Sequence, residues 1–209
     1  MEGGFQAERG MVVRISEVGR EERGFQLPPG DWLRFERLSD RAIRELETAL
    51  ALGRQSDEIY AELGELYLRG ANREEAKKYL QKAIELNPDN AHAHSCLGKC
   101  YRSDGNDLAA IAQFAMAAEL SPHDPEAHYE LGSARYKNGQ LRDSIPPLQK
   151  AVELKPDWAD ALINLGTSLY AIGELSQAIA AWRRFVALDP NSGEAVALVG
   201  AFPQLRGSA

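Results

Sequence analysis

The residues best suited to chemistry lie close together near the middle of the chain. They are His92, His94, Cys96 and Cys100. His92 and Cys96 are four residues apart, so on a helix they share one face, as pairs of metal ligands do. His94 and Cys100 fall instead at positions expected to pack, where a small or half-polar buried residue is common. Because two of the four side chains serve packing in this interpretation, we expect no metal site and no cofactor.

Other catalytic patterns do not occur in the sequence. It contains no glycine-rich phosphate loop, no nucleophile elbow and no paired-carboxylate motif. Glu126 and Glu130 are one helical turn apart, but so are many carboxylates on solvated helices. We therefore expect the protein not to be an enzyme.

A 34-residue period organises the elements that must position these side chains. A glycine and a proline each recur in four successive copies, together with one small and one large apolar position. In order these are Gly64, Gly98, Gly132 and Gly166; Pro88, Pro122, Pro156 and Pro190; Ala76, Ala110, Ser144 and Ala178; and Leu80, Phe114, Leu148 and Trp182. A period of this length with such positions in register is typical of a stacked helical array.

Each period contains two amphipathic helices joined by a tight turn. In residues 159–192, Leu162, Leu165 and Leu169 lie on one face of the first helix. Gly173 supplies the turn, and Pro190 ends the second helix because it has no N–H to donate. The small residues at the recurring glycine and alanine positions let the two helices approach closely.

This pattern resembles the tetratricopeptide repeat family, which implies an all-α, right-handed superhelical solenoid of helix-turn-helix repeats. Four complete units match at residues 57–90, 91–124, 125–158 and 159–192. Three segments flank these units: an N-terminal extension over 1–30, a capping helix or degenerate repeat over 31–56, and a truncated capping helix and tail over 193–209. Within the extension, residues 12–15 could form a short strand. In the capping segment we expect one helix from about Asp31, with Trp32, Leu33, Phe35 and Leu38 lying on the first full repeat.

Four positions depart from the family pattern. Arg135 occupies a usually large apolar position, so we expect its stem to pack and its head to reach solvent. Ala71 replaces the turn glycine. Pro146 and Pro147 lie early in a second helix, where we expect local distortion.

The resemblance implies a concave groove lined mainly by first helices. A second stripe on those helices, about a third of a turn from the packing stripe, would face that groove. It is acidic at the N-terminal end, carries cations and tyrosines in the middle and is neutral at the far end. The predicted partner-binding residues are Lys99, Arg102, Tyr129, Ser133, Tyr136, Asn164, Thr167 and Tyr170. The alternative is that they are ordinary solvated residues on a helix face.

This set of side chains favours a protein or peptide partner with apolar and acidic groups. Tyrosines provide large contact areas at low entropy cost, and Lys or Arg can hold a carboxylate. Two specialised forms of the family do not fit. Ala61 and Glu65 stand where a chaperone-tail clamp has a lysine and an asparagine, and Asn164 alone is no asparagine ladder.

The C-terminal segment supports a second hypothesis. Its apolar residues Val196, Leu198, Val199 and Phe202 would let copies stack end to end as a homo-oligomer. Alternatively they close over the fourth repeat.

Composition narrows the remaining classes of protein. The net charge is −7, with 24 basic and 31 acidic residues interspersed, so we expect no nucleic-acid partner. No apolar run is long enough to span a membrane, and from the charged N-terminal residues we expect no signal peptide. Two cysteines at helical spacing suit a reducing compartment. We therefore expect a cytoplasmic scaffold or adaptor.

Overall fold

The computed structural model describes residues 29–205, with side chains from Ser39 onward. The expected strand at 12–15, nearly all of the extension 1–30 and the expected contacts of Trp32, Leu33, Phe35 and Leu38 lie outside the described residues and side chains. Every regular element in the described part is helical. These elements are α2 (Pro29–Ala51), α3 (Asp57–Arg69), α4 (Arg73–Leu86), α5 (Ala91–Ser103), α6 (Asp107–Leu120), α7 (Pro125–Lys137), α8 (Leu141–Leu154), α9 (Ala159–Ala171), α10 (Leu175–Leu188), α11 (Gly193–Ala201) and the short 3₁₀ helix η1 (Pro203–Leu205). None of the described helices is long and apolar enough to cross a membrane.

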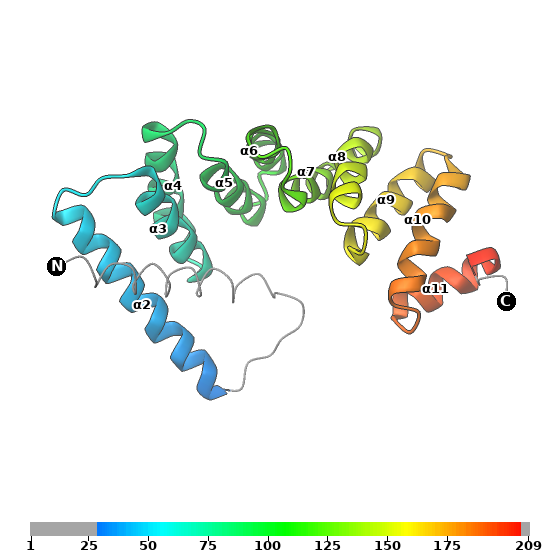
Figure 1. Cartoon of the computed structure of the whole chain (residues 1–209), viewed down its shortest axis with the longest axis horizontal. Coiled ribbons are helices and arrows are strands. Elements are labelled where there is room, and N and C mark those ends of the chain that lie inside the picture. Colours follow the sequence, from blue (N-terminus) through cyan, green and yellow to red (C-terminus); the bar gives the residue numbers. More distant parts are fainter. Residues whose placement is uncertain (1–28, 206–209) are drawn as a thin grey trace.

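The helices from α3 to α10 form a row of hairpins in sequence order, with α2 at one end and α11 at the other (Figure 1). Four helices start at Asp57, Ala91, Pro125 and Ala159, each 34 residues after the one before. Helix α3 contacts α5 and α7 contacts α9, whereas no two second helices of the described chain come into comparable contact. The row is therefore an all-α helical solenoid in which first helices lie next to first helices.

The recurring glycines make the close helix crossings within each hairpin. A Cβ on Gly64 would lie 2.4 Å from Cγ of Leu80, and a Cβ on Gly166 would lie 2.4 Å from Nε1 of Trp182. Both large partners are buried. The glycine and the large side chain thus fill one site together, which explains why they recur in step.

The turns between paired helices need a left-handed backbone. Gly105, Gly139 and Gly173 take φ values of 76°, 76° and 90°. The equivalent residue of the first hairpin is Ala71, which has φ 57°, whereas Gly70 next to it has φ −74°. Ala71 therefore adopts a conformation that costs a non-glycine residue roughly 1–2 kcal/mol.

Helix α8 continues through both of its prolines, so the expected distortion does not interrupt it. Pro147 has no N–H for the carbonyl of Asp143, four residues earlier. Arg135 donates from Nη1 to that carbonyl oxygen at 3.1 Å. The head of Arg135 therefore satisfies a backbone acceptor exposed by the proline, which is a more specific role than the predicted reach into solvent.

The N-terminal helix α2 is a single helix that covers the first hairpin. Its Ala42 is buried against Leu66 of α3. Glu47 accepts hydrogen bonds from the hydroxyls of Tyr67, at 2.8 Å, and Tyr79, at 3.5 Å. Burial together with this carboxylate raises the pKa of Tyr67 to about 12. Apolar packing and a shared acceptor thus hold α2 on α3 and α4.

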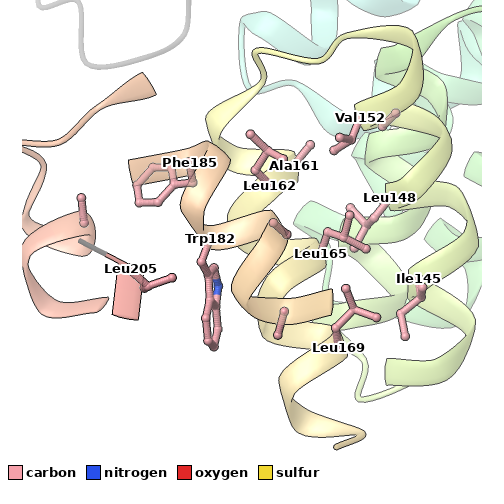
Figure 2. Close-up of a cluster of buried hydrophobic side chains, with 14 residues drawn as sticks. Ile145, Leu148, Val152, Ala161, Leu162, Leu165, Leu169, Trp182, Phe185 and Leu205 are labelled. Carbon is pink, nitrogen blue, oxygen red and sulfur yellow. The ribbon is translucent and has the colours of Figure 1, made fainter. Parts of the chain in front are cut away.

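The C-terminal end is closed by a cluster of large side chains. Leu205 of η1 is buried and lies beside Trp182 of α10 (Figure 2). The ring centroid of Phe202 is 5.0 Å from that of Trp182 and 5.5 Å from that of Tyr170. Helix α11 and η1 therefore cap the last hairpin.

Candidate functional site

The first helices carry a nearly continuous row of polar and aromatic side chains across successive hairpins. We call this row the first-helix face. It comprises Glu58, Glu65, Leu68, His92, Ser95, Lys99, Arg102, Glu126, Tyr129, Ser133, Tyr136, Asp160, Ile163, Thr167 and Tyr170. All except the buried Ser133 are at least partly exposed, whereas Ala61, which belongs to the same stripe in the sequence, is buried. The stripe identified in the sequence therefore remains largely accessible in the folded chain.

Ion pairs connect the first three first helices, α3, α5 and α7, in order along the row. Nε2 of His92 on α5 lies 3.1 Å from Oε2 of Glu65 on α3. Lys99 on α5 donates to Oε1 of Glu126 on α7 at 3.3 Å. In both pairs the partners are 27 residues apart, so the ninth position of one unit meets the second position of the following unit.

Glu130 on α7 joins this network from a buried position. Its carboxylate accepts a hydrogen bond from the Arg102 guanidinium and lies 3.7 Å from Nζ of Lys99. Burial of Lys99 opposes its charge, but Glu130 and Glu126 raise the pKa of the ammonium above its ordinary value. Both cations predicted to hold a partner's carboxylate therefore already contact carboxylates of the chain itself.

The three predicted tyrosines differ in what supports them. The Tyr129 ring packs against Trp158, with centroids 4.4 Å apart, and burial raises the pKa of its hydroxyl. Tyr136 is half-buried. Tyr170 is 49% exposed although it contacts Trp182 and Phe202. These contacts hold Tyr129 and Tyr170 in place while leaving part of each ring at the surface.

The smaller predicted residues contribute less accessible surface. Ser133 is only 3% exposed. Thr167 donates its hydroxyl hydrogen to the carbonyl of Ile163 at 2.9 Å, and Asn164 is half-buried. Of the predicted residues, therefore, only Ser133 is withdrawn from the surface, and Asn164 and Thr167 remain partly exposed.

The histidines and cysteines fall into two groups. His94 is buried, and its ring nitrogens lie 2.8 Å from Oε1 of Gln113 and 2.9 Å from the carbonyl of Pro88. Cys100 is fully buried, which raises the pKa of its thiol to about 11. Both residues pack, as predicted. His92 and Cys96 instead lie beside Glu65, a contact that the sequence interpretation missed.

Glu65 is held in place by two cationic groups. Burial would raise the pKa of this carboxyl group, but the hydrogen bond and charge of His92, together with Arg69, lower it to about 2. Arg69 binds Oε1 at 2.7 Å, which leaves Oε2 directed at His92. Opposite charges 27 residues apart were the sequence signal that could have identified both this contact and the Lys99–Glu126 pair.

Three of the four apolar residues predicted for self-association pack on their own chain. Leu198, Val199 and Phe202 lie against the C-terminal core cluster. Val196 is 61% exposed. Most of the apolar surface of α11 therefore serves to cap the last hairpin.

Comparison with known protein families identifies the family of this chain. The model of the tetratricopeptide repeat matches residues 61–125 and 129–195, which is more than half of the chain. The chain belongs to the tetratricopeptide repeat family. Proteins of this family are generally protein-interaction scaffolds rather than enzymes. Comparison with curated protein sequences gives no significant match.

Solved tetratricopeptide structures share the fold. One structure of MamA has a TM-score of 0.67 at 22% identity and covers 81% of this chain and 99% of its own. YrrB, described as a TPR protein with an unusual peptide-binding site, has a TM-score of 0.67 at 21% identity, covering 89% and 97%. MamA from Desulfovibrio magneticus RS-1, residues 41 to the end, has a TM-score of 0.67 at 19% identity, covering 92% and 99%. At these identities the likeness concerns the fold alone.

Proposed function

We propose that the protein is a non-enzymatic scaffold that binds a protein or peptide segment along the groove of the first-helix face, between Lys99 and Tyr170. The observation that carries this proposal is the group of partly exposed tyrosines on two neighbouring hairpins, each supported by packing or by a position on a rigid helix. A preformed surface of this kind loses little conformational entropy on binding. YrrB, of the same fold, is described by its peptide-binding site, which supports the class of ligand.

The aromatic residues provide the main anchors in this proposal. Tyr136 and Tyr170 offer ring surface to apolar side chains of the partner, and Tyr129, packed against Trp158, adds to that surface. Tyrosine is enriched among the residues that dominate binding energy at protein interfaces. In this proposal the tyrosines therefore bind the apolar groups of the partner.

In this proposal Lys99 binds an acidic group of the partner. Its side chain is 31% exposed, and its ammonium has three N–H donors for two neighbouring carboxylates. Glu126 is the more exposed of those two, so a carboxylate of the partner can share Lys99 with it or replace it. Arg102 lies between Glu130 and the ring of Phe114, 5.3 Å from its centroid, and so positions Glu130 more than it serves a partner.

Alanine substitutions on the first-helix face, with one on a second helix as a control, test this proposal. Partners captured from native lysate by the wild-type protein are identified, purified and titrated against the variants. We expect Tyr136→Ala and Lys99→Ala each to weaken binding at least about tenfold, the effect of losing a typical binding hot spot. Leu108→Ala is the matched control, because Leu108 is exposed on second helix α6. Equal affinity in all four proteins would refute the assignment.

Self-association is the second candidate, and it rests on the exposed Val196. If the C-terminal face joins copies, sedimentation equilibrium gives a mass above the monomer that falls to the monomer mass in Val196→Lys. A wild-type protein that stays monomeric at high concentration contradicts it.

A further inference from the structure

Three electron-pair donors of different chemistry converge at the junction of α3 and α5. Nε2 of His92 lies 3.1 Å from Oε2 of Glu65 and 3.7 Å from Sγ of Cys96. All three ligand atoms lie within 4.8 Å of one another. Among the described residues, this is the one group of three or more Cys, His and acidic side chains with such a spacing.

We propose that Glu65, His92 and Cys96 bind one Zn²⁺-type cation, with a fourth coordination position left for water or for a donor from a partner. In tetrahedral Zn²⁺ sites the metal–ligand distances place an oxygen and a nitrogen ligand about 3.4 Å apart, and a nitrogen and a sulfur ligand about 3.5 Å apart. The observed separations of 3.1 and 3.7 Å need only small side-chain adjustments. Three protein ligands and one open position are typical of reactive rather than purely structural zinc sites.

The donor set determines the class of metal. A thiolate and an imidazole favour Zn²⁺ and its late transition-metal neighbours, whereas Mg²⁺ and Ca²⁺ require oxygen ligands. Both neighbours of His92 lie against the same ring nitrogen, Nε2. One N–H can serve only one of them, whereas a cation coordinated by Nε2 can bind both as well.

The surrounding structure already orients the ligands. His92 and Cys96 are one turn apart on α5, and Glu65 is fixed on α3 by its ion pair with Arg69 at 2.7 Å. That pair uses Oε1 and leaves Oε2 for the cation, as partners of metal ligands commonly do. Cys96 is 3% exposed whereas the His92 side chain is 50% exposed, so the cation enters, and the fourth position opens, on the side of His92.

This inference goes beyond the proposed scaffold function. The site lies before the Lys99–Tyr170 region in the row of first helices, and its three ligands are not among the proposed partner-binding residues. A bound cation would link the first and second repeats directly. It would also give a partner one position for a coordinating side chain.

Titration of the full, reduced, chelator-treated protein with Co²⁺ alone tests the site. We expect one equivalent of Co²⁺ to give the absorption bands of tetrahedral Co²⁺ and a thiolate-to-metal charge-transfer band. Zn²⁺ added afterwards should displace the Co²⁺ and abolish both. Cys96→Ala removes the charge-transfer band. His92→Ala weakens binding by more than about tenfold, the loss that follows removal of even an outer partner of a metal ligand.

Cys100→Ala is the matched control, because Cys100 lies one turn further along the same helix but packs in the core. It should retain the bands. Helicity measured by circular dichroism is compared in all variants, and His92→Ala keeps the test valid if either cysteine variant fails to fold, because His92 lies largely at the surface. Absence of Co²⁺ binding to the wild type, or loss of the bands in Cys100→Ala but not in Cys96→Ala, would overturn the proposal. Neither outcome depends on the partner proposed for the tyrosines.

Discussion

Gly166→Ala tests how the glycine and the large side chain share one site in each hairpin. The new Cβ would lie 2.4 Å from Nε1, 2.5 Å from Cδ1 and 3.0 Å from Cε2 of Trp182. These are rigid ring atoms, and the ring is itself held by Tyr170 and Phe202. The indole cannot turn aside without displacing Tyr170 or Phe202, so relief of the clash requires a shift of these packed rings or of the α9 backbone.

Two opposing effects set the size of the change. Replacing glycine by alanine within a helix gains about 1 kcal/mol of intrinsic helix stability. Overpacking a well-filled core costs typically about 1–3 kcal/mol, and the rigidity of the indole favours the upper end. We therefore expect Gly166→Ala to lower the free energy of unfolding by about 2 kcal/mol.

Urea denaturation followed by circular dichroism measures this difference. The matched control is Gly200→Ala in α11, where no atom beyond the adjacent residues and the local helix backbone lies within 4 Å of the added Cβ, so it should gain up to about 1 kcal/mol. Trp182→Leu combined with Gly166→Ala should cost less than the sum of the single changes, because the smaller side chain makes room for the methyl group. A Gly166→Ala protein as stable as the wild type would refute the shared-site reasoning.

Three further changes test local features of the fold. Ala71→Gly should raise the free energy of unfolding by about 1 kcal/mol in urea denaturation, because it removes the cost of φ 57°; lower stability would contradict this. Arg135→Ala should cost about 1–2 kcal/mol in the wild type but clearly less in Pro147→Ala, where the freed carbonyl regains a backbone donor; equal costs in this double-mutant cycle would exclude the role of Arg135. The hydrogen bond from Asn87 lowers the pKa of Asp57, so the stabilisation by this carboxylate is complete above its unfolded pKa and is lost as the pH falls through the lower folded value. Asp57→Ala should accordingly cost about 1 kcal/mol at pH 7, and the difference between the two proteins should shrink below about pH 4; a difference independent of pH would contradict the assignment.

The repeat was readable from the sequence because it depends on local spacing. Glycine, proline and apolar residues in register predicted the tetratricopeptide family and an all-α solenoid, and both are confirmed. Periodicity within one unit decides which side chains pack, which is why His94 and Cys100 were recognised as packing residues.

Contacts between units were harder to predict. The charges of Lys99 and Arg102 were read as available to a partner, because their own carboxylates lie 27 or 28 residues away on another helix. The same separation concealed Glu65 beside His92, so the donor group appeared to have two members instead of three. Such pairs depend on how one hairpin is rotated against the next, and the pattern of a single helix does not contain that rotation.

The pairing of Arg135 with α8 escaped prediction for a related reason. Both the proline in the helix and the arginine at an apolar position were visible as departures. Their connection depends on the direction of one guanidinium group toward the Asp143 carbonyl. Two anomalies in neighbouring helices thus compensate each other, which is visible only when both helices are placed in space.

Site-specific photocrosslinking shows whether a partner binds on the first-helix face. A photoreactive phenylalanine analogue is placed at Tyr136 on the first-helix face, or at Leu108 on second helix α6 as the control, and the protein is irradiated in native lysate. We expect a discrete crosslinked partner from position 136 and none from position 108. A partner crosslinked only from position 108, or adducts containing only copies of this chain, would contradict binding on the first-helix face.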